Sequence, residues 1–171
     1  MKNDKARGAG RASFLLAQVG AHAAQKFAER LKPLGFAPHH AGLLRMLANS
    51  PGISQQDLAK ALRMHASNLV GIVDELEKSG LLERKLSRTD RRVYALHLTD
   101  RGKQSLAKIG EAAKEHGRAL LAALTEPQRM ELARLLEAIA EEQGLAAGVH
   151  PGYATIRSAR GATRPSNQGD D

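Results

Sequence analysis

The stretch LLERKLSRTDRRVYALHLTDRG, residues 81–102, sets the interpretation of the whole chain. Apolar and polar residues alternate on both sides of a polar turn at residues 87–90, which predicts a hairpin of two short strands. Several basic residues lie near the end of this hairpin, where their side chains could follow the phosphates of a nucleic acid or enter a narrow minor groove. The alternative is a solvated charged turn, which basic runs often form. The candidate contact residues are Arg84, Lys85, Arg88, Arg91 and Arg92, with Asp90 placed to hold one of these arginines.

An amphipathic helix is predicted just before the hairpin, over residues 65–78. Four apolar residues recur at helical spacing and form one stripe: Leu69, Ile72, Val73 and Leu76. The opposite side is left to polar or small residues that could face a major groove. Asn68 is the best candidate for a base edge, because its amide can donate to adenine and accept from it at once. The candidate residues on this face are His65, Ser67, Asn68 and Gly71, and the alternative is an ordinary solvated helix surface.

Helical periodicity and capping signals predict five further helices, at residues 13–31, 38–47, 54–62, 99–124 and 125–144. Ser54, Thr99 and Thr125 are the predicted N-cap residues. Two short helices joined by a tight turn and followed by a basic hairpin occur in the order of a winged helix-turn-helix. The predicted fold class is therefore mainly α with a small β-hairpin wing.

The chain divides into three parts by pattern. Residues 1–12 are basic and glycine-containing and predict a flexible N-terminus, and residues 13–144 predict one domain with the winged helix-turn-helix at about 38–99. Glycine, proline, serine and charge replace periodicity from residue 145 onward. A largely disordered tail is predicted over residues 145–171, in which residues 149–153 could dock.

Composition narrows the function. Lysine and arginine number 26 against 18 acidic residues, a net charge of +8, which fits a polyanionic partner. Aromatic residues make up only 3% of the chain, which disfavours single-strand binding by base stacking and favours a duplex. The absence of cysteine excludes disulfides and thiolate zinc sites. No apolar run is long enough for a bilayer and no signal peptide is recognisable, so a cytoplasmic location is expected. No enzyme motif appears, so neither catalysis nor a cofactor is predicted.

The motifs together resemble the MarR family of bacterial transcription regulators. Residues 90–92 read DRR and residues 96–102 read LHLTDRG, which is similar to that family's wing signature of D-R-R followed by L-x-L-T-x-x-G. Residues 67–80 resemble the family's recognition helix, and the likeness spans about residues 13–144. One departure is that Val70 and Gly71 stand where the family often has Thr or Ser and Arg, so fewer side chains here can reach bases.

The resemblance implies a homodimer formed by dimerisation helices at about residues 13–34 and 100–144. Each subunit would read half of a pseudo-palindromic operator in double-stranded DNA. The family also implies a small aromatic or anionic effector held between the dimerisation helices and the DNA-binding lobe. The candidate pocket residues are His22, His39, His40, Arg45 and His116, each of which could equally be a surface or hydrogen-bonded interior residue. No histidine pair has metal-ligand spacing, so no metal site is expected.

Two functions remain open on the sequence alone. The first is a sequence-specific transcription regulator, a repressor released by a small-molecule ligand. The second is an architectural or weakly specific DNA-binding protein that uses the same basic surface, which the small side chains at Val70 and Gly71 would permit. Competition between a palindromic site and random duplex separates the two, because a specific regulator prefers its site by about 1,000-fold or more.

Overall fold

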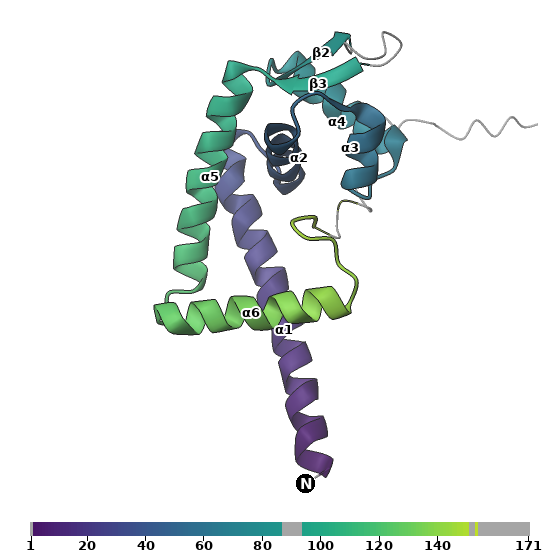
Figure 1. The fold of residues 1–171 in the computed structure, drawn as a ribbon. Coiled ribbons are helices and arrows are strands. Elements are labelled where there is room, and N and C mark those ends of the chain that lie inside the picture. The colour runs from purple at the N-terminus through teal and green to yellow at the C-terminus, as the bar shows by residue number, and fades with distance from the viewer. Residues whose placement is uncertain (1, 87–93, 151–152, 154–171) are drawn as a thin grey trace, which may run out of the picture.

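The computed structural model describes residues 2–86, 94–150 and 153. It is mainly helical with one small antiparallel sheet (Figure 1), which confirms the predicted fold class. The helices are α1 (Lys2–Leu31), α2 (Pro38–Asn49), α3 (Gln55–Ala61), α4 (Ala66–Lys78), α5 (Asp100–Leu120) and α6 (Glu126–Glu142), with a 3-10 turn, η1, at Lys32–Leu34. The strands are β1 (Ile53–Ser54), β2 (Leu82–Leu86) and β3 (Tyr94–Leu98).

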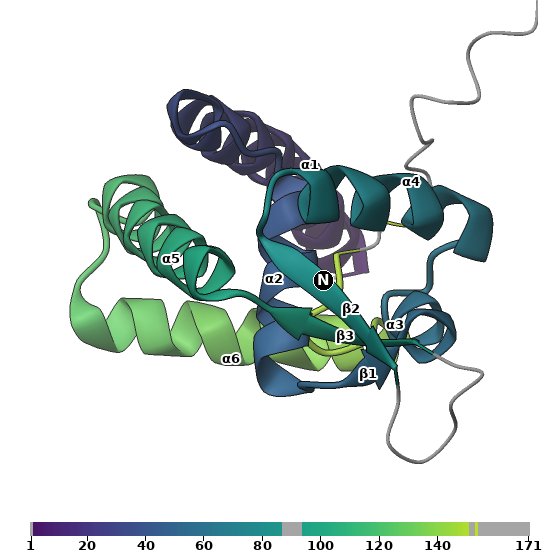
Figure 2. The same ribbon diagram turned by 90° about the horizontal axis from the view of Figure 1, so that it is seen from above.

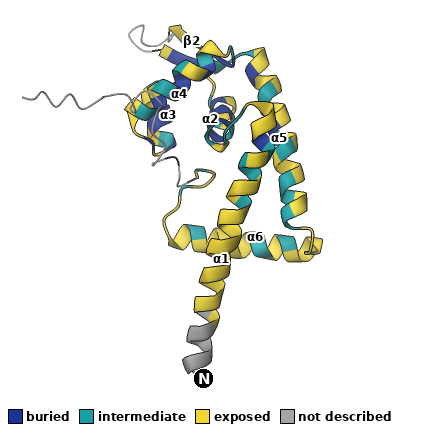
Figure 3. Ribbon diagram, turned by 180° about the vertical axis from the view of Figure 1, so that it is seen from behind, coloured by how far each residue is buried: buried dark blue, intermediate teal, exposed yellow. Residues whose placement is uncertain are grey.

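The core lies where α2, α3, α4 and the sheet meet. In both Figure 1 and Figure 2, α2 lies between α5 on one side and α3 and α4 on the other. Leucines of all these elements are fully buried there, as the dark blue segments of Figure 3 show. The largest are Leu43, Leu44 and Leu47 of α2, Leu58 of α3, Leu69 and Leu76 of α4, and Leu82 and Leu96 of the sheet.

Three predicted helix boundaries are confirmed, two by capping hydrogen bonds and one by a backbone conformation. The Ser54 hydroxyl accepts a hydrogen bond from the Asp57 amide at the start of α3, 3.1 Å away. The Thr99 hydroxyl accepts from the Gly102 amide at the start of α5, 3.0 Å away, and donates to the Gly80 carbonyl. Gly80 ends α4 with a φ of 67°, a left-handed conformation that glycine adopts without strain.

The sheet has three strands, so the prediction of a two-stranded hairpin is incomplete. β2 and β3 pair as expected, with Arg84 opposite Leu96, and β1 adds to the other edge of β3 with Ile53 opposite Leu96. The Gly52 amide, which donates to the Leu96 carbonyl at 2.9 Å, extends this pairing. A strand of two residues is too short to show any alternation, which is why the sequence pattern missed it.

Helix α1 begins at Lys2, which corrects the prediction of a flexible segment over residues 1–12. The lysine, alanine and arginine of this segment are good helix formers, so the helix continues there without an apolar stripe. Residues 10–22 of this helix are exposed (Figure 3). Phe14 is 66% exposed, and Leu15, Leu16 and Val19 are also exposed. This part of α1 lacks a cover within the described chain.

The chain after α6 packs against the core where it is described. Residues 145–150 are described, Val149 packs against the core, and Tyr153 is buried, which confirms the docking predicted for this part of the tail. Residues 151–152 and 154–171 of the predicted tail lie outside the described residues.

None of the described helices has the length and apolar character needed to cross a membrane.

We predict that Gly102→Ala destabilises the fold by about 1–3 kcal/mol or more, because close packing leaves no room for a side chain. A Cβ at Gly102 would lie 2.0 Å from the backbone oxygen of Leu81, so α5 could no longer dock against the start of the wing. Gly110→Ala is the control on the same helix, because a Cβ there meets nothing within 4 Å. Urea denaturation of both variants checks this, and equal midpoints would contradict it.

Candidate nucleic-acid interface and effector pocket

Helix α4 is divided into a buried and an exposed side. The four apolar residues predicted to share a stripe are all buried, at 4% exposure or less: Leu69, Ile72, Val73 and Leu76. On the other side, Ser67 and Val70 are exposed, and Asn68 and Gly71 are half-buried. His65 is the exposed N-cap residue, and its side chain makes no capping hydrogen bond. The structure therefore places the four predicted recognition residues at the start of one accessible face.

The corner between α3 and α4 fixes the direction in which this face points. Arg63 adopts a positive φ of 50°, which reverses the chain over a very short turn. The Met64 amide donates to the Ala59 carbonyl at 2.9 Å and closes the end of α3. Met64 and Leu62 are buried beside it. The two helices are thus held as a rigid helix-turn-helix pair.

Arg84 joins the wing to α4. Its Nη2 donates to Asp74 Oδ1 at 2.7 Å and its Nη1 donates to Glu77 Oε2, while its backbone amide donates to Glu77 Oε1 at 3.2 Å. Nη2 also lies 3.4 Å from Gln55 Oε1 of α3. Partial burial by itself lowers the pKa of Arg84, but the Asp74 and Glu77 carboxylates raise it overall. Arg84 was predicted to contact DNA, whereas in the structure it holds β2, α3 and α4 together.

Of the other predicted wing residues, only Lys85 lies in the described part of the chain. Lys85 is exposed and forms an ion pair with Glu83 at 2.6 Å, which leaves it at the surface beside the end of the wing. Leu86 and Tyr94, the last paired residues of the two strands, are also exposed. Arg88, Asp90, Arg91 and Arg92 lie outside the described residues.

Two of the predicted pocket histidines lie on α2, facing α4. His40 is buried, and its Nδ1 accepts a hydrogen bond from the Ala37 amide at 3.1 Å. Its Nε2 has no hydrogen-bond partner within the part of the chain that the structure describes, and it lies 3.7 Å from Glu75 Oε1. The His39 ring is 4.1 Å from the His40 ring. Burial lowers the pKa of both residues, that of His39 to about 4 with a further contribution from His40, which favours the neutral form of each ring.

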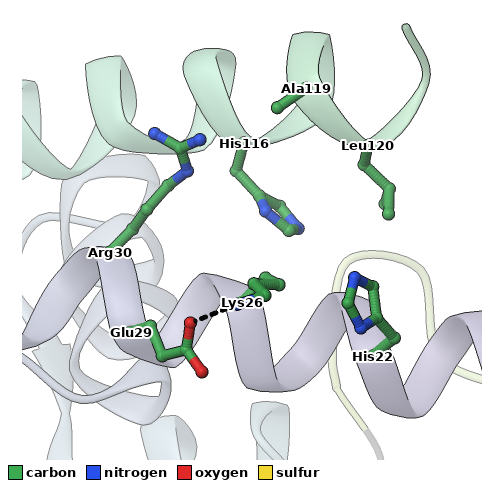
Figure 4. A pocket seen from close by; sticks show the side chains of 7 residues that line it. All are labelled: His22, Lys26, Glu29, Arg30, His116, Ala119 and Leu120. Atoms are coloured by element: carbon green, nitrogen blue, oxygen red, sulfur yellow. Dashed lines mark hydrogen bonds and ion pairs between the residues drawn. The ribbon is translucent and has the colours of Figure 1, made fainter.

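A pocket of about 380 Å³ lies between α1 and α5 (Figure 4). His22 of α1 and His116 of α5 both line it, which brings together two of the five predicted pocket residues. His116 lies 5.5 Å from Phe27, ring centre to ring centre. Burial lowers the pKa of His116, and nearby Arg30 and His22 lower it further. The pocket is lined by His22, Lys26, Glu29, Arg30, His116, Ala119 and Leu120.

The other three predicted pocket residues do not line this pocket. His39 and His40 pack toward α4, and the Arg45 guanidinium donates to the Gly148 carbonyl at 2.6 Å. Lys26 and Arg30, which also line the pocket, were not among the predicted residues. A signal was present, because His22, Lys26 and Arg30 are spaced by four and must share one face of a helix.

Comparisons with known proteins agree with this geometry. A model of the MarR family matches residues 34–93. A Thauera aromatica protein named as a transcriptional regulatory protein for the hcr operon is 38% identical over 130 residues, which are 75% of this chain and 78% of that protein. The HTH-type transcriptional repressor Rv2887 of Mycobacterium tuberculosis is 35% identical over 130 residues, covering 75% of this chain and 93% of its own.

Solved structures similar to this chain also include transcriptional repressors bound to DNA. The transcriptional repressor CouR, solved with a 23-mer DNA duplex, is 30% identical with a TM-score of 0.68, over 75% of this chain and 91% of that chain. Rv2887 was solved with DNA, at 30% identity and a TM-score of 0.65, over 74% of this chain and 95% of that chain. Rv2887 was also solved with salicylic acid, at 31% identity and a TM-score of 0.61, over 74% and 94%.

We predict that Arg84→Met lowers the free energy of unfolding by about 1.5–3 kcal/mol, because Asp74 and Glu77 lose their charged hydrogen-bond donor. Lys85→Met is the matched control: its ion pair with Glu83 is exposed, and such pairs contribute about 0–1 kcal/mol. Chemical denaturation measures both. Equal losses would show that Arg84 is not a structural link.

We predict that stability falls as the pH drops from about 6.5 toward about 4. The pKa of His39 is about 4 in the folded chain against an ordinary 6.5, so the unfolded chain binds protons first in this window. Glu75, which favours the charged form of His39, opposes the fall only in part. Thermal unfolding at a series of pH values checks this. His39→Gln should flatten the dependence and the same substitution at exposed His65 should not; identical curves would contradict the prediction.

Proposed function

Because the chain belongs to the MarR family of transcription regulators, we propose that it is a repressor that binds double-stranded DNA in a sequence-specific manner. The observation that carries this proposal is the exposed face of α4, locked beside a wing by Arg84. A helix of this kind fits the major groove, while the wing follows the adjacent phosphates. Ser67, Asn68 and Gly71 are the residues proposed to approach the bases, with His65 at the helix start.

The protein acts as a homodimer in this proposal. Most of the exposed large apolar residues lie on α1 and α6, where Phe14 and Met130 are 66% and 62% exposed. Leu135, Leu136 and Ile139 of α6 are exposed as well. Apolar surface of this extent is stabilised when a second copy covers it. Two recognition helices about 34 Å apart would then address successive major grooves of one duplex face.

The pocket between α1 and α5 is the proposed effector site. Arg30 and Lys26, which pair with Glu115 at 3.3 Å and Glu29 at 2.8 Å, supply donors for an anion that displaces these carboxylates, and two histidines lie beside them. Leu120 and Ala119 supply apolar surface for a small ring. CouR and Rv2887 were solved with DNA, and Rv2887 also with salicylic acid, which supports a small aromatic acid here. A ligand weakens DNA binding only if it favours a different separation of the two lobes. A preference of about 1–3 kcal/mol changes occupancy by five- to 150-fold.

The second candidate is an architectural DNA-binding protein with little base selection. Val70 is 39% exposed and Gly71 lacks a side chain, so the middle of α4 offers bases no hydrogen-bonding group at these two positions. Neither catalysis nor a cofactor forms part of either proposal.

Selection of bound fragments from random duplex DNA tests the function. We expect an enriched symmetric site that is preferred over random duplex by about 1,000-fold or more at physiological salt. Binding to this site should weaken when salicylate is added. Enrichment of no sequence would favour the architectural protein, and the absence of duplex binding would reject both candidates.

We predict that Asn68→Ala relaxes selection at one base pair in each half-site and costs about 1–3 kcal/mol there, because the bidentate amide contact is lost. Asn68→Asp would keep the size and lose the donor. Repeating the selection with each variant gives the preference profile. Gly110→Ala on α5, where a Cβ meets nothing within 4 Å, is the control, and an unaltered profile for Asn68→Ala would exclude base contact by this residue.

A further inference from the structure

The chain beyond α6 returns to the DNA-reading lobe, as the yellow-green segment of Figure 1 shows. We call residues 144–150 with Tyr153 the C-terminal strap. Two arginines of the lobe hold it: Arg45 of α2 donates to the Gly148 carbonyl at 2.6 Å, and Arg63 donates to the Gly144 carbonyl at 3.2 Å. Arg63 is the positive-φ residue at the corner between α3 and α4. The strap is therefore bound both to α2 and to the corner of the helix-turn-helix pair.

Tyr153 is fitted to α2 at a glycine. The tyrosine is only 8% exposed and belongs to the same buried cluster as the leucines of the core. A Cβ on Gly42 would lie 1.7 Å from the phenol oxygen of Tyr153, so the ring lies directly on the helix backbone. Glycine inside a helix costs about 1 kcal/mol relative to alanine. The close approach of Tyr153 gives a packing reason for Gly42.

The strap has a defined turn structure of its own. The Leu145 amide donates to the Ala140 carbonyl at 2.9 Å, and the Val149 amide donates to the Ala146 carbonyl at 3.1 Å. Gly144 and Gly148 have positive φ values of 63° and 70°, and their carbonyls are the ones that Arg63 and Arg45 bind. These glycines turn the chain so that both acceptors face the lobe.

The position of the strap affects how the DNA-reading lobe is held relative to α6. Helix α6 carries exposed apolar residues for the second copy, and it has no broad packing contact with α2, α3 or α4 among the described residues. The strap supplies hydrogen bonds that join the end of α6 to α2 and to the corner between α3 and α4. Binding of two successive grooves requires a defined distance between each lobe and the dimerisation helices.

We propose that the C-terminal strap is a brace that fixes the DNA-reading lobe relative to α6, and that Tyr153 locks it. This inference rests on the proposed function, because the brace matters through DNA binding. Without the brace, the lobe occupies several positions, and only some of them fit both grooves. The apparent affinity for DNA then falls in proportion to the population of those positions.

The test uses the full-length chain and the duplex obtained by selection. Tyr153→Ala should raise the Kd for this duplex by about five- to 150-fold. Tyr153→Phe keeps the ring and should bind as the wild type does, and the exposed Ala147→Ser in the strap should do the same. A Kd that is unchanged or lower in Tyr153→Ala overturns the proposal.

Gly42→Ala tests the same lock from the other side. It should weaken DNA binding as Tyr153→Ala does, and the combination of both substitutions should be no weaker than Tyr153→Ala alone, because the strap is already released. Gly117→Ala on α5 is the matched control, since a Cβ there meets nothing within 4 Å. Additive losses in the double variant overturn the proposal.

Hydrogen exchange separates failure of the brace from failure of the proposed function. Tyr153→Ala should speed exchange at the Leu145 and Val149 amides and along α2. If the wild type binds no duplex, the proposed function fails, while faster exchange still demonstrates that the strap holds the lobe. Unchanged exchange in Tyr153→Ala overturns the brace whatever the DNA result.

Discussion

The proposed DNA-reading surface depends on the burial of one side of α4. Leu69, Ile72, Val73 and Leu76 are nearly inaccessible, and each contributes about 1.5–3 kcal/mol of hydrophobic stabilisation. Because a helix has two opposite sides, burying this stripe leaves the side with Ser67 and Val70 facing outward. The recognition face is therefore a consequence of the core rather than an independent feature of the surface. Any change that rotates α4 in the core also rotates this face.

Polar contacts then hold the neighbouring elements against α4. Arg84 ties β2 to Asp74 and Glu77, so wing and recognition helix move together. The strap ties the corner between α3 and α4 to the segment after α6. The lobe is thus rigid within itself, while its position relative to α1, α5 and α6 rests on fewer contacts. This division is what an effector between α1 and α5 could exploit, since only the weaker joint has to move.

The sequence predicted those parts of the structure that depend on local signals. Short-range patterns located the helix-turn-helix and the wing. These patterns are the N-caps at Ser54 and Thr99, the end of α4 at Gly80, and the change from helical to alternating periodicity after it. Strand β1, the roles of Arg84 and Arg45, and the place of His40 depend on contacts between residues far apart in the chain. Basic residues near the wing look alike in sequence whether they face DNA or a carboxylate. The pocket was half predicted for the same reason: His22 and His116 belong to different helices, and only the fold brings them together.

The pairing of Arg84 also affects how the protein responds to ionic strength. Duplex DNA is surrounded by condensed cations, and each protein cation that displaces one of them steepens the loss of affinity with added salt. Arg84 is already balanced by two carboxylates, those of Asp74 and Glu77, so this cluster offers the duplex no excess positive charge. The salt dependence of DNA affinity is consequently set by fewer basic groups than the composition contains. Part of the positive charge instead stabilises the fold through internal ion pairs.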